Sequence, residues 1–417
     1  MLRNNYSLFR AVTRGPNVRV RFRSVSNQNF PPVILGIETS CDDTGAAVID
    51  GDGNILGEDL CSQQSYSTRF GGVIPTFAKA QHKLKIDAVV RNAIQRSGCS
   101  LQDIDAIAVT TKPGLPVCLK VGVDYAVNLC RSTKKPLIPI HHMAAHACTI
   151  RLLNRNASFP FLALLLSGGH SILTLVRSVN DFLLLGSTLD IAPGEAFDKV
   201  ARRLQLCNIK AENETMSGGH LIEMYAQGGD PLAFQFPYPI RRRDCNFSFS
   251  GLASAAVRYI EKHELQSGSV IREDCGKLMD LCASFQHAVF RHIAKRLLRA
   301  MTYLEMKALQ AGNDTKRLVV SGGVASNSYF RQGLDYVCQN NGYELLSPPP
   351  SLCTDNGVMI AWLGIEKYIA GLEVLHDFPD DYPVQARAPL GVDVSADIAD
   401  LDIPPSRLKF NVCLHSV

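Results

Sequence analysis

The sequence lacks several features that would assign the chain to a common class. No apolar run approaches the roughly 18 residues needed to cross a bilayer, so we expect no membrane association. The 13 cysteines are scattered and form no Cys-x-x-Cys pair, which argues against a disulfide framework and a thiolate zinc site. Gly-Lys-Ser/Thr and Gly-x-Gly-x-x-Gly are also missing, which excludes a P-loop and a dinucleotide fingerprint.

Acidic residues are absent from the beginning of the chain, where the first carboxylate is Glu38. Residues 1–30 contain no lysine and six arginines, namely Arg3, Arg10, Arg14, Arg19, Arg21 and Arg23. An arginine-rich, acid-free leader without the apolar core of a secretory signal is typical of a mitochondrial transit peptide. The alternative is a basic arm that binds nucleic acid. We predict a transit peptide over residues 1–30 and a location in the mitochondrial matrix.

The rest of the chain has the composition of an ordinary globular enzyme. Without the six leader arginines, 37 basic residues stand against 39 acidic ones, a net charge of about −2. Hydrophobic residues make up 46% of the sequence and charged residues 20%. A length of 417 residues is sufficient for two domains, each with its own core.

Strand and helix patterns alternate, which predicts an α/β fold with largely parallel sheets. A buried strand over residues 33–40, a polar turn over 41–45 and a second strand over 46–49 predict a hairpin. The elements expected after this hairpin are helices over residues 81–95 and 120–130 and strands over 104–110 and 137–140.

The same pattern begins again after an asparagine-rich break over residues 154–158. An apolar strand over residues 161–166 is followed by Ser167, Gly168 and Gly169 and by a returning strand over 171–176. A third such segment, residues 318–327, leads into a helix. We therefore predict an N-terminal lobe over 33–158, a C-terminal lobe over 159–376 whose last helix packs back on the first lobe, and a tail over 377–417.

The Ser-Gly-Gly turns offer backbone N–H groups without side chains that would hold phosphate oxygens away. A tight turn with no ligand is the alternative. Two lobes that each begin with a hairpin, with a Gly-Gly loop in the second, resemble the actin, hexokinase and heat-shock ATPase superfamily. This resemblance implies a two-lobed α/β fold with mixed sheets flanked by helices.

Two histidines four residues apart, His142 and His146, would leave the same face of a helix. Asp355 lies in a turn-like segment and is a plausible third ligand. Two imidazoles and one carboxylate suit a single divalent ion, zinc or iron, and can leave coordination positions open. The alternative is that the histidines only cap or pack a helix.

Seven motifs in order give a more specific resemblance, to the tRNA threonylcarbamoyladenosine transferases, that is, bacterial TsaD and the catalytic subunit of the KEOPS complex. With the leader, the chain resembles their mitochondrial branch. The motifs are Gly36-Ile-Glu-Thr-Ser-Cys-Asp-Asp-Thr44, His141-His-Met-x-x-His146, Leu166-Ser-Gly-Gly-His170, Gly194-Glu-Ala-Phe-Asp-Lys199, Phe247-Ser-Phe-Ser-Gly-Leu252, Gly322-Gly-Val-x-x-Asn327 and Cys353-Thr-Asp-Asn-Gly357.

The resemblance implies roles for individual residues. His142, His146 and Asp355 match the metal ligands. The residues that match the binding site of the adenylate are Leu165, Leu166, Ser167, Gly168, Gly169, Asp198, Gly219, Glu223, Ser326 and Asn327. Alternative roles are a surface ion pair with Lys199 for Asp198, a solvated helix face for Glu223 and a helix cap for Asn327. The tyrosine that archaeal members have before Ser-Gly-Gly is replaced by Leu165.

The implied reaction transfers threonylcarbamoyl from threonylcarbamoyl-AMP to adenosine 37 of tRNAs that read codons beginning with A. The adenylate would come from a separate synthase, and a homodimer is expected. Asp42 and Asp43 are candidates for a general base, although a phosphate-facing or water-ordering role is equally open. Residues 241–243, three arginines, are the best candidates for tRNA contact. The rival classes are a metalloprotease and a sugar kinase or ATPase of the same superfamily.

Overall fold

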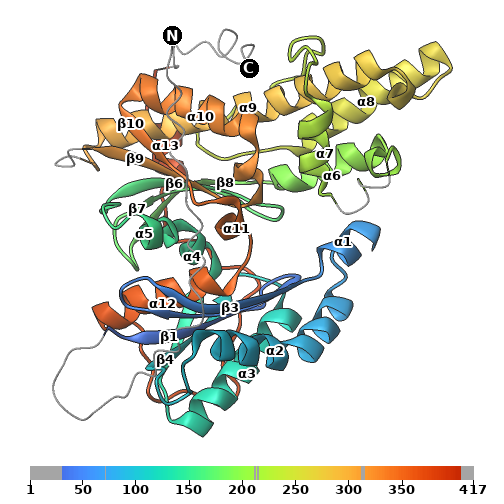
Figure 1. Cartoon of the computed structure of the whole chain (residues 1–417). Helices are drawn as coiled ribbons and strands as arrows, with labels where there is room; N and C mark the ends of the chain where they lie inside the picture. The colour runs from blue at the N-terminus through green and yellow to red at the C-terminus, as the bar shows by residue number, and fades with distance from the viewer. Residues whose placement is uncertain (1–30, 71, 211–212, 214–215, 311–314, 405–417) are drawn as a thin grey trace, which may run out of the picture.

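The computed structural model describes residues 31–70, 72–210, 213, 216–310 and 315–404. The predicted transit peptide and the last residues of the predicted tail lie outside the described residues. Two sheets, each with helices on its faces, form the two halves of the molecule (Figure 1). This architecture confirms the expected α/β class. In the part of the chain that the structure describes, no helix is both long and apolar enough to cross a bilayer.

The first sheet has the strand order β3-β2-β1-β4-β5. Its strands are β1 Val33–Glu38, β2 Asp43–Asp50, β3 Ile55–Ser62, β4 Ala106–Lys112 and β5 Leu137–His141. The predicted hairpin is confirmed, but β2 begins at Asp43, so the turn is shorter than expected. The expectation of a largely parallel sheet is wrong, because β2 pairs antiparallel with both β1 and β3 and only β1–β4 and β4–β5 are parallel.

The helices of this half are α1 Gln64–Phe70, α2 Pro75–Ser97, α3 Pro116–Thr133, α4 His142–Cys148 and α5 Ile150–Leu153. Helices α2 and α3 both begin earlier than the apolar spacing predicts. Each starts with a proline. The first N–H groups of a helix have no intrahelical partner, so proline, which lacks an N–H, loses no hydrogen bond at this position. Gly98, which has a φ of 67°, caps the C-terminus of α2.

The second sheet has the strand order β10-β9-β6-β7-β8-β11. Its strands are β6 Phe161–Leu166, β7 Ser171–Val176, β8 Phe182–Ser187, β9 Lys316–Ser321, β10 Tyr343–Leu346 and β11 Val392–Asp393. The second predicted hairpin is confirmed as β6 and β7, which pair antiparallel. Strands β10, β9 and β6 are parallel neighbours, so this sheet is also mixed.

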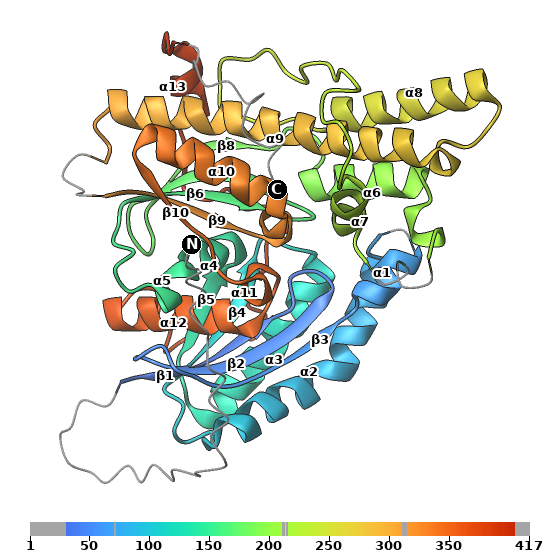
Figure 2. The ribbon, with the colours of Figure 1, turned by 45° about the horizontal axis from the view of Figure 1, so that its top comes forward.

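The remaining helices precede, follow or connect these strands. They are α6 Pro193–Arg203, η1 Leu206–Asn208, α7 Gly218–Tyr225, α8 Ser250–Ser267, η3 Ile271–Glu273, α9 Cys275–Met306, η4 Gly323–Ser326, α10 Ser328–Asn341, α11 Pro350–Cys353, α12 Gly357–Ala370 and α13 Ser395–Asp400. Helices α9 and α10 cover the outer face of the second sheet (Figure 2).

Helices α4 and α12 lie between the two sheets (Figure 1). One buried core joins their apolar side chains to those of both sheets, such as Ile34 and Ala108 from the first and Ala163 and Val319 from the second. Helix α12 packs closely on β1, since a Cβ at Gly36 would lie 2.2 Å from the backbone N of Ala361. This layer fixes the start of α4 against the start of α12.

The segment after α12 contacts both halves. Phe378 and Tyr382 pack against the core of the first sheet, and Leu390 is buried in the core between the sheets. Strand β11 then pairs with β8 at the edge of the second sheet. The described part of the predicted tail is therefore packed on the protein. The boundaries of the lobes remain a prediction.

Candidate metal and nucleotide site

The first two candidate ligands lie on α4, which begins directly at the end of β5. His142 is the first residue of this helix and His146 lies one turn later, with ring centroids 4.7 Å apart. Only 5% of His142 and 2% of His146 is exposed. Polar rings buried in this way require polar or metal partners.

The third candidate, Asp355, lies in the turn between α11 and α12. Its Oδ1 lies 3.0 Å from Nε2 of His146 and 3.4 Å from Nε2 of His142. Asn356 fixes this turn, because its side chain accepts a hydrogen bond of 2.8 Å from the backbone N of Met359 and caps α12. The three ligand atoms lie within 4.8 Å of one another and could hold one metal ion.

The charges of this group also favour a cation. Burial would lower the pKa of His142, but the carboxylates of Asp355 and Glu38 hold it well above its usual value. Burial would likewise raise the pKa of Asp355, but His142 and His146 hold it well below its usual range. The carboxylates of the buried Glu38 and the partly exposed Asp355 therefore retain their negative charge and attract a positive one. Two imidazole nitrogens and a carboxylate oxygen are a donor set that fits zinc or iron.

Glu38 was not among the predicted site residues. It is fully buried at the end of β1, and its Oε2 lies 3.3 Å from Nδ1 of His142. The same carboxylate accepts a hydrogen bond from Thr110 and one of 2.5 Å from the backbone N of Ser40. A carboxylate on Nδ1 fixes the tautomer that leaves Nε2 for the metal. The signal in the sequence is an acidic residue that ends an otherwise apolar strand.

The predicted Ser-Gly-Gly turn connects β6 and β7 beside the metal ligands. Ser167 closes it with its Oγ, which accepts a hydrogen bond of 2.9 Å from the backbone N of His170. The His170 ring centroid lies 6.4 Å from that of His142, and burial together with the charge of His142 lowers its pKa to about 4. His170 was also missed, because only its position after the glycines points to the site.

The two glycines of the turn face open space. A Cβ added at Gly168 or Gly169 would have no atom within 4 Å. By contrast, a Cβ at Gly194 would lie 2.7 Å from Cα of Gly168, so the first turn of α6 approaches the loop closely. The N-terminus of this helix adds its free N–H groups to the same region, which suits an anion. Leu165 and Leu166 point into apolar cores and could contact a ligand only through their backbone.

The predicted nucleotide-binding residues join α6, α7 and α10. Asp198 on α6 accepts a hydrogen bond of 2.9 Å from the backbone N of Gly218, next to Gly219 at the start of α7. Burial raises the pKa of Asp198. Glu223 on α7 accepts hydrogen bonds from the backbone N (2.7 Å) and the Oγ of Ser328. It therefore links two helices and does not simply lie on a solvated helix face.

Ser326 ends η4, and Asn327 precedes α10. The Asn327 side chain accepts a hydrogen bond of 3.0 Å from the backbone N of Phe330 and donates one of 2.9 Å to Gln286. The alternative role of Asn327 as a helix cap is thus confirmed. Such a cap also holds the η4 loop in place, so capping is compatible with a ligand on this loop.

The two candidate bases have different surroundings. Asp42 accepts a hydrogen bond of 2.8 Å from Oγ of Ser67. Oδ1 of Asp43 is buried and has no hydrogen-bond partner among the described residues. Burial raises the pKa of Asp43 to about 7, whereas its ordinary value is 3.8. A carboxyl that titrates near neutral pH is suited to accept a proton, so Asp43 is the better candidate.

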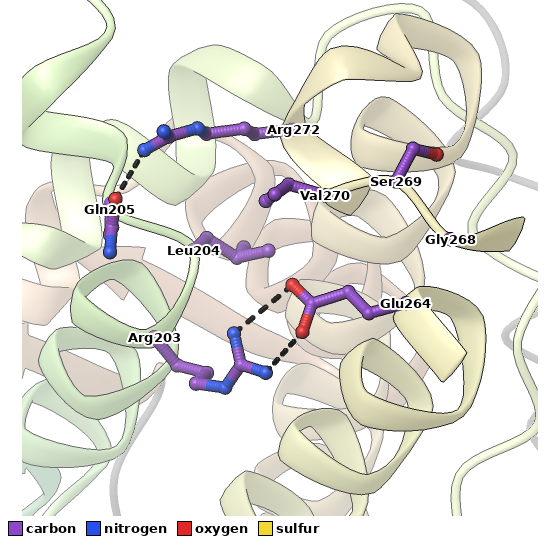
Figure 3. A pocket seen from close by; sticks show the side chains of 8 residues that line it. All are labelled: Arg203, Leu204, Gln205, Glu264, Gly268, Ser269, Val270 and Arg272. Carbon is purple, nitrogen blue, oxygen red and sulfur yellow. Dashed lines mark hydrogen bonds and ion pairs between the residues drawn. The ribbon is translucent and has the colours of Figure 1, made fainter.

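A separate pocket lies at the other end of α6, between that helix and the end of α8 (Figure 3). Arg203 forms two hydrogen bonds with Glu264, of 3.2 and 2.5 Å, across it. Gln205 accepts a hydrogen bond from Arg272 on its other side. The guanidinium groups of Arg203 and Arg272 are thus both hydrogen-bonded to side chains of this pocket. None of the predicted metal- or nucleotide-binding residues lines it.

Comparison with known proteins shows the family to which the chain belongs. A family model described as TsaD, tRNA N6-adenosine threonylcarbamoyltransferase, matches residues 54–362. The chain is 48% identical to a mitochondrial tRNA N6-adenosine threonylcarbamoyltransferase of Rattus norvegicus, with 91% of each chain covered. It is 44% identical to the Homo sapiens protein of the same name, with 95% of this chain and 97% of the other covered.

Among solved structures, full-length HypF in its phosphate- and nucleotide-bound form resembles the fold with a TM-score of 0.50. That match covers 82% of this chain and 56% of HypF at 12% identity, so it concerns the fold alone. The family model covers well over half of the chain, and the relatives cover nearly all of it. The chain therefore belongs to the tRNA N6-adenosine threonylcarbamoyltransferase family.

Proposed function

We propose that this protein transfers the threonylcarbamoyl group of threonylcarbamoyl-AMP to the exocyclic amine of adenosine 37 in tRNA. The proposal rests above all on one observation, the convergence of His142, His146 and Asp355 beside the open turn at Gly168 and Gly169. A cation site next to an anion site fits a substrate in which a reactive carbonyl is joined to a phosphate. The recipients are mitochondrial tRNAs that read codons beginning with A.

The donor would lie across the turn, with its adenosine toward α7 and α10. Backbone N–H groups of Gly168 and Gly169 and of the α6 N-terminus would face the phosphate, while the N–H of Ser167 closes the turn on the carbonyl of His170. Asp198 and Gly219 would contact the ribose, and Glu223, Ser326 and Asn327 would lie around the adenine. These groups come from helices that are already hydrogen-bonded to one another, so little ordering is needed when the donor binds.

His142, His146 and Asp355 would hold one divalent ion, zinc or iron, which supplies a Lewis acid for the carbonyl of the donor. The adenosine amine forms a bond to the carbonyl carbon, and the bond from that carbon to the phosphate oxygen breaks, so that AMP leaves. The amine gives up one proton, and Asp43 would accept it. A neutral adenine amine is a poor nucleophile, so most of the acceleration would come from positioning and from the activated donor.

The partners follow from this chemistry. A separate synthase would supply the adenylate that the reaction consumes. We further propose a homodimer and a location in the mitochondrial matrix. The mitochondrial names of the relatives support the compartment.

The rival reactions fit the residues less well. Peptide hydrolysis by a zincin requires a glutamate directly after the first histidine as its general base, but His142 is followed by Met143. A sugar kinase or ATPase binds magnesium through the phosphates and has no use for two buried histidines.

The test is to incubate the protein with threonine, bicarbonate, ATP, an active synthase and a transcript that carries adenosine 37. Mass spectrometry of the nucleosides should then detect threonylcarbamoyladenosine. A transcript with guanosine at position 37 and the variant His142→Ala are the controls, and both should give no product. Absence of product with the wild-type protein, while the synthase makes adenylate, would reject the proposed function.

A further inference from the structure

A buried histidine outside the metal site has no part in the proposed reaction. His82 lies in the buried stripe of α2, between Ala78 and Ile86, and is 0% exposed. Its Nε2 lies 3.0 Å from the carbonyl oxygen of Cys41, and its Nδ1 lies 2.8 Å from Oγ1 of Thr44. A carbonyl oxygen only accepts, so Nε2 carries the hydrogen and Nδ1 accepts a hydrogen bond from the Thr44 hydroxyl. Burial lowers the pKa of His82, so the ring is neutral at neutral pH.

The two partners of this ring enclose the candidate base. Cys41 directly precedes residues 42–43, and Thr44 directly follows them, where the turn after β1 leads into β2. In the part of the chain that the structure describes, Oδ1 of Asp43 is buried and has no hydrogen-bond partner. This oxygen is available to accept a proton, and its direction depends on the backbone that carries it. His82 bonds to that backbone segment on both sides of Asp43.

The segment held by this ring borders the candidate metal centre. A Cβ at Gly45, the residue after Thr44, would lie 2.8 Å from the backbone N of Gly357, two residues after Asp355. Burial raises the pKa of Asp43, and the negative charge of Asp355 raises it further. The start of β2 therefore lies against the turn that supplies the third metal ligand.

We propose that His82 is a positioning residue, which holds the segment 41–44 so that the carboxyl group of Asp43 faces the reacting amine. The inference rests on the proposed function, in which Asp43 accepts the proton of that amine. A base must lie within hydrogen-bond reach of the proton that it takes, so a small shift of the segment would remove Asp43 from the reaction. A misplacement of about 1 Å costs up to about a hundredfold in rate.

The alternative is that His82 only fills space in the core. An apolar residue of similar volume could then replace it at a cost in stability and at no cost in chemistry. The two hydrogen bonds of the ring argue against this role, because they satisfy a carbonyl and a hydroxyl that flank the candidate base.

The test uses the full-length protein with added threonylcarbamoyl-AMP and a transcript that carries adenosine 37. His82→Leu removes both hydrogen bonds of the ring. It should lower the single-turnover rate at saturating adenylate about tenfold to a hundredfold, while KM for the adenylate and the metal content stay at their wild-type values. His82→Gln keeps a side-chain N–H for the carbonyl of Cys41 and should restore most of the rate.

Thr44→Val tests the second bond of the ring, because it removes only the hydroxyl that donates to Nδ1. It should lower the same rate, by a smaller factor than His82→Leu. Thr174→Val is the matched control, since Thr174 is also buried and its hydroxyl donates to the carbonyl of Leu183 within the second sheet. The control should lose stability in thermal melting and keep the wild-type rate.

Asp43→Asn separates positioning from a structural role. If His82 acts through Asp43, then His82→Leu should lower the rate no further in an Asp43→Asn background, because the two effects are not additive. A structural role would lower the rate by the same factor in both backgrounds, and that result would overturn the proposal.

A wild-type rate in both His82→Leu and Thr44→Val would also overturn it. So would a loss of metal in proportion to the loss of rate, which would make His82 a support of the metal centre. If the wild-type protein forms the modified nucleoside while these variants behave like the control, only the positioning role fails. If the wild-type protein forms no modified nucleoside, the proposed function fails and the positioning role fails with it.

Discussion

Oε2 of Glu38 lies 3.3 Å from Nδ1 of His142. A buried carboxylate thus contacts the ring nitrogen opposite the one that would bind the metal. We expect Glu38→Gln to weaken metal affinity about tenfold and Glu38→Ala to weaken it further, up to about a hundredfold, because outer partners orient the ligating ring. Competition with a chromogenic chelator measures this affinity. The control is Glu344→Gln, since that exposed residue pairs with Arg317 away from the site. Equal affinity in the Glu38 and control variants would remove Glu38 from the metal site.

Metal affinity should also depend on pH. In the metal-free protein, burial lowers the pKa of His142, but Asp355 and Glu38 hold it well above its usual value, so the ring carries a proton at neutral pH. A metal ion must displace that proton. Below the raised pKa, affinity should therefore fall by about tenfold for each unit of pH decrease. Titration calorimetry in buffers of different ionisation enthalpy should detect proton release at pH 7, and a pH-independent affinity with no release would contradict this.

Asp43 makes a prediction about stability. Burial raises its folded pKa to about 7 from an ordinary 3.8, so the folded protein disfavours the ionised form. Relative to Asp43→Asn, the wild-type protein should lose stability as pH rises from about 4 to about 7, with a constant difference above that range. Over this pH range, the free energy of unfolding of the wild-type protein should fall relative to that of Asp43→Asn by a total on the order of 1–4 kcal/mol. Denaturant melts of metal-free protein at several pH values measure it, and parallel pH profiles of the two proteins would show that the pKa of Asp43 is not raised.

The close approach of α6 to the Ser-Gly-Gly turn can be tested through Gly194. A Cβ there would lie 2.7 Å from Cα of Gly168, so Gly194→Ala must push the helix away from the loop. We expect KM for the adenylate to rise about tenfold, because the N–H groups of the turn and the helix no longer face the same phosphate. Gly251→Ala is the matched control, since a Cβ at Gly251 has no atom within 4 Å. A KM equal to that of the control would place the phosphate elsewhere.

Much of the fold follows from local patterns in the sequence. Both hairpins were predicted because apolar strands flank short polar or glycine turns, and their antiparallel pairing is confirmed. The starts of α2 and α3 were missed, although Pro75 and Pro116 were available as signals of a first helical turn. Pairing of distant strands has no local signature, which explains the wrong expectation for the first sheet.

Less of the candidate site than of the fold could be predicted from local patterns in the sequence. The interval of four residues placed His142 and His146 on one face, but nothing local joins them to Asp355, more than 200 residues away. Its turn-like segment made Asp355 a plausible third ligand, and the resemblance to a family assigned it that role. Glu38 and His170 were missed because their roles depend on packing across strands.

The most direct test of the account is the metal content of the purified protein, determined by elemental analysis. The wild-type protein should hold about one zinc or iron per chain, and Asp355→Ala and His146→Ala should each lose nearly all of it while retaining a cooperative thermal transition. Full metal content in both folded variants, or none in the wild-type protein after reconstitution with either metal, would contradict the proposed metal centre.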